Sequence, residues 1–283
     1  MEKPLDYKIV RIVLLAALAC FALGALLVRA VVPAVRLNRA ERLMASGDYG
    51  RAYALVKGLD YKNSAELAAE AVSRAQKAGL GAVTVGSTVR FGTYEQDNDV
   101  SNGPEEIEWT VLDVDGNRAL LISRFGLESR EFNDEKNAYS AVTWANSQLR
   151  KWLNTSFYET AFSAGQQETI LLSRVTADRN PDSDVFPGSD TSDRIFLLST
   201  EEAWRYFASD GERMCAATEY CHARGAEKGD NGACWWWLRT PGIEPSTVAV
   251  VIARGTVFTN GFSCGHVPNL AVRPAMWIDL AGN

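Results

Sequence analysis

The sequence predicts a mixed α+β domain over residues 83–283, preceded by a membrane helix and a short helical stalk. A long apolar run near the N-terminus gives way to helical periodicity. Beyond Ala82, short β-branched runs alternate with turn residues and with two or three helices that lie mainly in the middle of the region. This mixture is typical of the α+β class, and all eight tryptophans lie within it. We therefore divide the chain into residues 1–35, 36–82 and 83–283.

Charge separates the same regions. Residues 1–82 hold 12 Lys and Arg against 7 Asp and Glu, whereas residues 83–283 hold 17 against 28. An acidic domain repels a polyphosphate backbone, so the composition argues against nucleic-acid binding.

The first region is predicted to span a membrane. Ile12–Val28 is uncharged and almost wholly apolar, with Arg11 and Arg29 at its ends. Because Arg29 can extend its charge to the interface, residues 30–35 continue the apolar stretch. Residues 12–35 are then long enough to cross a bilayer as one helix.

A cleaved signal peptide, with Lys3, Lys8 and Arg11 as its basic region, is the alternative to this anchor. Basic residues are nearly balanced on the two sides of the span, so they do not fix its orientation. We expect a single-pass protein of the cell membrane whose large domain is extracellular.

Helical periodicity continues from Leu37 to Leu80, with Ser64 as the expected N-cap of the last helix. The pattern Leu43-x3-Gly47-x-Tyr49-x2-Ala52-x2-Leu55 resembles a tetratricopeptide-like hairpin. Such repeats are stable in stacks of three or more, and here there is barely one. We interpret residues 36–82 as a spacer between membrane and domain, with a peptide-binding groove as the alternative.

In the third region, turn residues delimit short elements. The expected strands are Thr84–Tyr94, Glu106–Asp113, Arg118–Ser123, Arg194–Ser199, Trp235–Leu238, Thr247–Ala253, Thr256–Thr259 and Val272–Trp277. The expected helices are Trp144–Leu153, Gln166–Leu172 and Thr200–Phe207. Asp115-Gly116 and Arg254-Gly255 predict hairpin turns, and Ser199 with Glu202 predicts a capping box.

One loop has the spacing of a calcium site. Asp178, Asn180, Asp182 and Asp184 place oxygen ligands at every second residue. Pro181 stiffens the loop and Ser183 replaces the glycine of an EF-hand, so a solvated acidic loop is the alternative. Calcium is the one cofactor that the sequence suggests.

No spacing predicts an enzyme. The chain has two histidines, no nucleophile elbow and no phosphate loop. Cys215, Cys221, Cys234 and Cys264 lack the Cys-x2-Cys spacing of structural zinc. They are an even set that either forms two disulfides outside a cell or stays reduced inside one.

The run Trp235-Trp236-Trp237 suggests stacking on a sugar ring. Because alternate side chains of a strand face opposite sides, we expect Trp236 in the core and treat Trp235 and Trp237 as candidate contacts.

Several phrases resemble one family. They are Gly86-Ser-Thr-Val-Arg-Phe-Gly-Thr-Tyr94-Glu-Gln96, Ile107-Glu-Trp109-x-Val-Leu112, Leu149-Arg150-x-Trp152-Leu-Asn154, Phe196-Leu-Leu-Ser199, Trp236-Trp-Leu-Arg239-x-Pro-Gly242 and Val272-Arg-Pro-Ala-Met-Trp277-Ile. In this order they resemble the bacterial domain of unknown function 6273 family (DUF6273), over roughly residues 83–280. The closing phrases are similar to the C-terminal half of C-type-lectin-like domains, which include the sulfatase-modifying-factor group and the variable proteins of diversity-generating retroelements.

This resemblance implies a C-type-lectin-like recognition module for an unidentified protein or glycan ligand. Trp236, Arg239, Arg273 and Trp277 would be scaffold, and the loops Thr240–Thr247 and Phe258–Leu270 would be exposed. The candidate ligand-binding residues are Trp235, Trp237, Glu244, Ser246, Thr259, Asn260, Phe262, Ser263, His266 and Asn269.

Two other functions stay open. One is a formylglycine-generating type of oxidoreductase that uses Cys264 or Cys234, although no copper-site motif surrounds Cys264. The other is a structural protein of the cell envelope.

Overall fold

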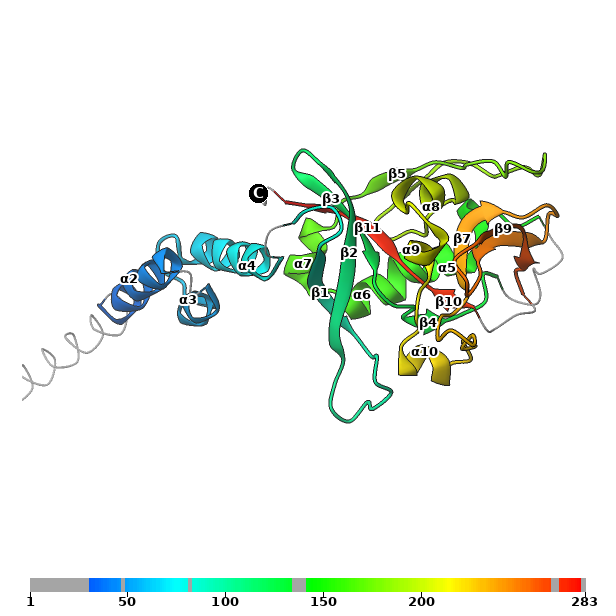
Figure 1. Cartoon of the computed structure of the whole chain (residues 1–283). Helices are drawn as coiled ribbons and strands as arrows, with labels where there is room; N and C mark the ends of the chain where they lie inside the picture. Colours follow the sequence, from blue (N-terminus) through cyan, green and yellow to red (C-terminus); the bar gives the residue numbers. More distant parts are fainter. Residues whose placement is uncertain (1–30, 47–48, 81–82, 134–140, 266–269, 281–283) are drawn as a thin grey trace, which may run out of the picture. The chain divides into compact units, whose positions relative to one another are not determined.

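The computed structural model describes residues 31–46, 49–80, 83–133, 141–265 and 270–280. The chain divides into two compact units, Met1–Gln76 and Lys77–Asn283 (Figure 1). Each unit has its own hydrophobic core. Within the described ranges, no helix has the length and apolar character needed to cross a bilayer. Most of the span predicted over residues 12–35 lies outside those ranges.

Helices make up the first unit as far as it is described: α2 (Val32–Ala45), α3 (Tyr49–Val56) and α4 (Ser64–Leu80). The predicted helical region from Leu37 to Leu80 is confirmed, in three pieces. The helices share a small core of Leu37, Ala40, Met44, Ala52, Val56, Leu67 and Ala71. Ser64 was predicted as the N-cap of the last helix, but it is the first residue of α4. Its buried hydroxyl donates to the carbonyl of Leu59.

The larger unit contains a four-stranded antiparallel sheet in the order β1-β2-β3-β11. Its strands are β1 (Thr88–Tyr94), β2 (Glu105–Asp115), β3 (Arg118–Ser123) and β11 (Ala275–Asp279). Asp115 pairs with Arg118 across a turn in which Gly116 has a φ of 58°, so the predicted hairpin is confirmed. Because β11 pairs with β3, the last strand of the domain joins its first hairpin.

A second sheet has five strands in the order β4-β10-β7-β8-β9. They are β4 (Glu128–Ser129), β10 (Ala271–Val272), β7 (Trp236–Pro241), β8 (Thr247–Val251) and β9 (Val257–Ser263). Gly255, with a φ of 86°, turns the chain between β8 and β9 and confirms the second hairpin. β9 continues to Ser263, so about half of the expected loop Phe258–Leu270 is strand.

The other elements are short. They are η3 (Trp144–Asn146), α5 (Gln148–Trp152), η4 (Leu153–Phe157), α6 (Tyr158–Ala161), α7 (Ala164–Thr169), β5 (Ser173–Val175), β6 (Thr191–Asp193), α8 (Thr200–Tyr206), α9 (Asp210–Arg213) and α10 (Glu219–Ala223). The capping box before α8 is confirmed, because Ser199 Oγ accepts from Glu202 N at 3.2 Å and Glu202 Oε2 accepts from Ser199 N at 3.0 Å. The helix predicted to Leu172 ends at Thr169, where Ile170 forms a β-bridge to Ile278.

The strand predicted over Arg194–Ser199 is wrong. The chain bends at Arg194 and Ile195, and Ile195 to Leu198 are buried, as the apolar run indicated. Phe196 forms an isolated β-bridge with Ala275, with backbone hydrogen bonds of 2.9 and 2.7 Å, and the carbonyl of Leu198 accepts from Arg239 N–H of β7 at 2.9 Å. The apolar composition predicted the burial of this segment correctly, but it could not predict whether its backbone would form a continuous ladder of hydrogen bonds with a strand.

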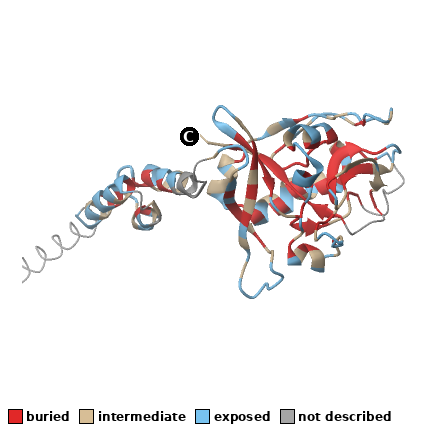
Figure 2. Ribbon diagram, viewed as in Figure 1, coloured by how far each residue is buried: buried red, intermediate tan, exposed pale blue. Residues whose placement is uncertain are grey.

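Buried residues are concentrated on the strands of the two main sheets and the segments between them (Figure 2). Four indoles lie in this core, and each N–H has an acceptor. Trp109 donates to the carbonyl of Phe91 at 2.7 Å, Trp144 to Asp193 Oδ2 at 2.8 Å, Trp236 to the carbonyl of Arg213 at 3.1 Å and Trp237 to the carbonyl of Arg130 at 2.9 Å. The predicted α+β class is confirmed.

Candidate functional site

A cavity of about 260 Å³ opens on the larger unit beside β4, the start of α5 and the end of α10. Its lining is mostly polar: Ser129, Arg130, Glu131, Asn133, Gln148, Leu149 and Arg224. We call this space the Arg130 cavity.

Backbone hydrogen bonds fix one wall of the Arg130 cavity. Asn133 is buried, and its Oδ1 accepts from the backbone N–H of Gln148 at 3.0 Å. Leu149 N–H donates to the carbonyl of Phe132 at 3.2 Å, so residues 132–133 satisfy donors at the start of α5. Asn133 N–H donates to the carbonyl of Cys264 at 3.0 Å, which ties this wall to the end of β9.

A buried carboxylate holds the opposite wall. Glu128 is 3% exposed and accepts from Tyr94 Oη at 2.9 Å and from Arg224 Nε at 3.2 Å. Burial of the phenol, reinforced by the nearby Glu128 charge, raises the pKa of Tyr94 above its ordinary range. Tyr94 therefore stays a neutral donor, and Glu128 positions the partly exposed Arg224 at the cavity.

Arg130 differs from the other buried or half-buried arginines of the domain. Its guanidinium lies 4.7 Å from the ring centroid of Trp152, and its carbonyl accepts from Trp237. Within the described part of the chain, no carboxylate or carbonyl accepts a hydrogen bond from this guanidinium. A half-buried guanidinium held by an indole offers its N–H groups to an external acceptor, and a carboxylate fits their geometry best.

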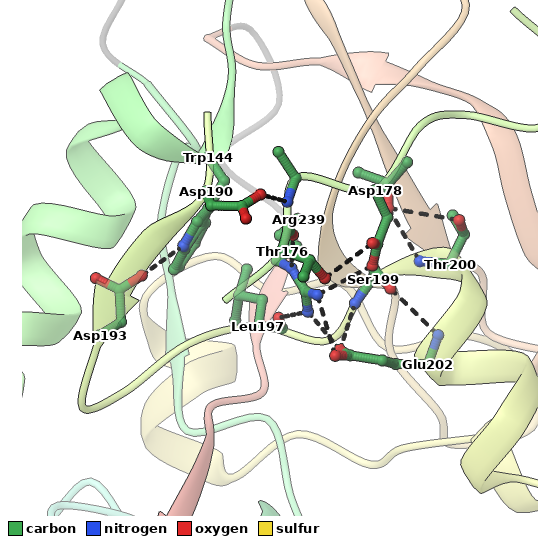
Figure 3. Close-up of polar contacts among 12 residues, drawn as sticks. Trp144, Thr176, Asp178, Asp190, Asp193, Leu197, Ser199, Thr200, Glu202 and Arg239 are labelled. Atoms are coloured by element: carbon green, nitrogen blue, oxygen red, sulfur yellow. Dashed lines mark hydrogen bonds and ion pairs between the residues drawn. The ribbon is translucent and has the colours of Figure 1, made fainter. Parts of the chain in front are cut away.

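Arg239, predicted as scaffold, lies in a buried ionic network (Figure 3). Its Nη2 donates to Asp178 Oδ2 at 3.1 Å and to Glu202 Oε1 at 3.0 Å. It also donates to the carbonyls of Thr176 at 3.2 Å and Leu197 at 2.9 Å. These bonds join β7 to the start of α8 and to the segment after β5.

Arg273, also predicted as scaffold, is buried between two rings. Its guanidinium carbon lies 5.0 Å from the ring centroid of Trp236 and 5.3 Å from that of Phe207. Its Nε donates to the carbonyl of Ser123 at 2.9 Å, linking the two sheets. Trp277 is only partly buried, and Arg118 lies 4.6 Å above its ring.

The expectation that Trp237 is available to a ligand is wrong. Its ring is fully buried and packs on Phe132 at 5.6 Å. Strand alternation suggested one buried face for β7, but Trp236 and Trp237 are both buried because both faces of the strand are covered. Trp235 is half-buried and meets the ring of Phe262 at 4.9 Å.

The two candidate loops meet where β8 begins and β9 ends. Ile243 N–H donates to the carbonyl of Asn260 at 3.2 Å, and Cys264 N–H donates to the carbonyl of Ser246 at 3.1 Å. The beginning of the loop Thr240–Thr247 was expected to be exposed, but Thr240 to Gly242 are buried. Residues 243–245 are exposed. The remaining candidates divide as follows: Glu244 and Asn260 are exposed, Ser246, Thr259, Phe262 and Ser263 are half-exposed, and His266 and Asn269 lie outside the described residues.

In the loop proposed for calcium, several oxygens have protein partners. Asp178 binds Arg239, and Asn180 Oδ1 accepts from Asp182 N–H at 2.8 Å. The Asn180 amide donates to the carbonyls of Pro241 and Thr259, both at 2.8 Å. Asp182 Oδ2 accepts from Thr259 Oγ1 at 2.7 Å, and Asp184 is exposed. Hydrogen bonds from this loop to Thr259 hold the edge strand β9. Among the described residues, the carboxylates of this loop do not form a cluster close enough to share one metal ion.

Glu95, Asp97 and Glu105 bring carboxylate oxygens within 4.8 Å of one another at the β1–β2 connection. Turn hydrogen bonds account for much of this arrangement, because Glu105 Oε2 accepts from Gln96 N–H at 2.7 Å and Asp97 Oδ1 accepts from Asp99 N–H at 2.8 Å. Burial and the two neighbouring carboxylates raise the pKa of Glu95.

Cys215, Cys221 and Cys234 are free thiols, and all three are buried, as is Cys264. Burial raises the pKa of Cys264, which opposes formation of a reactive thiolate there. This environment does not favour the oxidoreductase alternative at Cys264.

Sequence reasoning missed the Arg130 cavity. Its main wall is the run Glu128-Ser-Arg-Glu-Phe-Asn133, in which polar residues surround one buried phenylalanine. This run contains no glycine or proline, which argues against a flexible loop. The sequence could therefore have indicated that its polar side chains are held in fixed positions. Arg224 could not be assigned, because its place at the cavity depends on the buried Glu128 nearly a hundred residues earlier.

Comparison with known families adds one finding. A model described as domain of unknown function (DUF6273) matches residues 116–280, which is more than half of the chain. No match was found to a curated protein or to a solved structure. The chain therefore belongs to the DUF6273 family, as its motif order predicted.

Proposed function

We propose that the larger unit is a non-catalytic recognition module that binds a carboxylate-bearing glycan through the Arg130 cavity and the adjoining loops before β8 and after β9. The observation that carries this proposal is the half-buried guanidinium of Arg130. It faces a polar cavity without an acceptor from the described chain. Its preferred partner is a planar oxyanion.

The size and lining of the cavity favour a sugar. Its volume of about 260 Å³ suits one ring rather than a drug-sized ligand. Glu131, Asn133 and Gln148 supply side chains of the kind that bind hydroxyl groups in pairs. The half-buried rings of Trp235, Phe258 and Phe262 offer further apolar contacts on the same sheet.

The buried scaffold supports a C-type-lectin-like arrangement. Arg239, Arg273 and Trp236 lock the strands beneath the loops, while residues 243–245 and Asn260 stay exposed. A rigid base with an exposed irregular edge is the usual design of a recognition surface.

The proposal includes display outside the cell. Residues 12–35 would anchor the chain and residues 36–82 would act as a spacer. Alkaline carbonate should then leave the full chain in the membrane pellet, and protease added to intact cells should remove the larger unit. Release by carbonate, or protection from protease in intact cells whose known surface proteins are digested, would contradict this arrangement.

Binding is tested with the full chain in detergent on an array of glycans with and without glucuronic or sialic acid. Arg130→Gln should weaken capture of the acidic glycans at least about tenfold, because a hydrogen bond to a charged group contributes about 1.5–3 kcal/mol. Arg118→Gln is the matched control, since Arg118 also lies over an indole but pairs with Asp115 away from the cavity.

The two variants should have similar melting temperatures. Unchanged capture by Arg130→Gln, or equal weakening by both variants, would overturn the proposed site. Selective capture of peptides with acidic side chains, in place of glycans, would overturn the glycan assignment.

A further inference from the structure

Two cysteines face each other across a backbone bridge. Cys215 and Cys234 form an isolated antiparallel β-bridge, and Cys234 N–H donates to the carbonyl of Cys215 at 2.7 Å. Directly opposed residues in antiparallel pairing have Cα atoms about 4.5–5.5 Å apart, within the range of about 4.4–6.8 Å that a disulfide spans. Both side chains are buried, and both thiols are free.

We propose that Cys215 and Cys234 form a cross-strand disulfide when the chain folds in an oxidising compartment. The bond would close the segment 216–233 at its base. This modification goes beyond ligand binding and does not depend on what the ligand is.

The surroundings suit this pair. A hydrogen bond between the two thiols, aided by the Arg273 charge, lowers the pKa of Cys215, while Cys234 is shifted upward. Gly126 also leaves room, because a Cβ there would lie 3.4 Å from Cys234 Sγ and 2.6 Å from the Ala271 methyl group. The fold therefore places the two sulfurs side by side, with space for a bond between them.

The exchange balances with a protein or glutathione disulfide as oxidant. The thiolate of one cysteine attacks one sulfur of that disulfide, bonds to it and releases the other sulfur as a thiol. The thiolate of the second cysteine then attacks the sulfur of the first cysteine and displaces the bound oxidant sulfur as a second thiol. The pair loses two electrons and two protons, and the oxidant becomes two thiols. Because both sulfurs are buried in the folded unit, the reaction belongs to folding, before the bridge closes.

Cys221 and Cys264 do not lie opposite another cysteine in a β-bridge of the described residues. Cys221 lies on α10, where burial raises its pKa. Cys264 follows β9 and is tied to Ser246 and Asn133. Within the described residues, neither is bridged to another cysteine by backbone pairing.

The closed segment carries α10 and Arg224, which lines the Arg130 cavity. It is also held by the Gly126–Ala217 bridge, by Tyr220 N–H donating to the carbonyl of Gln96 at 3.0 Å, and by Arg224 on Glu128. A disulfide at its base would restrict the segment in the unfolded chain and so stabilise the folded wall.

The test refolds the purified full chain in a mixture of reduced and oxidised glutathione. The chain is then alkylated under denaturing conditions and mapped by mass spectrometry. We expect one linked peptide pair, Cys215 with Cys234, and alkylated Cys20, Cys221 and Cys264. Added reductant should lower the melting temperature by roughly 5–10 °C.

Cys215→Ala with Cys234→Ala should make the melting temperature insensitive to reductant, whereas Cys221→Ala should keep the shift. The peptide map of the unaltered chain serves even if a variant fails to fold. Five alkylated cysteines after oxidative refolding, or a link to Cys221 or Cys264, would overturn the proposal. Glycan capture is measured separately, so failure of either proposal leaves the other standing.

Discussion

Single residues show how the domain carries charge in its interior. The side chain of Arg239 is 2% exposed, and two carboxylates and two carbonyls offset the cost of removing its charge from water. Arg174 is 79% exposed and pairs with Asp190 on the surface. Both are arginine–aspartate contacts, but only the first is inside the fold.

We expect Arg239→Met to lower the free energy of unfolding by about 3–5 kcal/mol, because Asp178 and Glu202 lose the cation that neutralises them. The same change at Arg174 should cost at most about 1 kcal/mol, since exposed ion pairs are weak. Guanidinium unfolding of the full chain measures both. Similar losses for the two variants would show that the buried network does not stabilise the domain.

Among the elements, the hairpin turns follow most directly from local sequence. Gly116 and Gly255 both have positive φ, at 58° and 86°, a conformation that glycine adopts without steric cost. Their surroundings differ. A Cβ on Gly116 would meet nothing within 4 Å, whereas one on Gly255 would lie 1.7 Å from the carbonyl oxygen of Asp210 on α9. Arg213 Nε also donates to the Gly255 carbonyl at 2.9 Å, so this turn packs against α9.

Gly116→Ala should therefore cost about 1 kcal/mol, the usual penalty of positive φ for a residue with a side chain. Gly255→Ala should cost at least about twice that, because α9 must move away from the β8–β9 turn as well. Melting curves of the two variants separate backbone strain from steric overlap. A Gly116→Ala loss as large as that of Gly255→Ala would contradict this account of α9.

Local signals predicted the elements better than they predicted the site. The two hairpins, the capping box of α8 and the helical character of Leu37–Leu80 depend on neighbours in sequence, and all are confirmed. The prediction that Trp237 is exposed was wrong because its burial depends on Phe132, which is more than a hundred residues away in the sequence. The Arg130 cavity was missed for the same reason, since it joins β4, α5 and α10.

At the scale of the whole molecule, the described residues form two separate hydrophobic cores. Seven residues of α2, α3 and α4 form the first, and the second is made from the sheets and helices of the larger unit. The boundary after Gln76 falls within α4. Stability of the larger unit should then come from its own residues.

We expect a chain beginning at Lys77 to fold, and to melt within about 2 °C of the corresponding transition in the full chain. It should also keep the proposed selectivity for acidic glycans, because every residue that lines the Arg130 cavity belongs to the larger unit. Calorimetry and the glycan array measure the two expectations. A truncated chain that fails to fold would mean that the first unit completes the second, and residues 36–82 could then no longer be interpreted as a spacer. If it folds and binds, the proposed interpretation of residues 36–82 as a spacer stands.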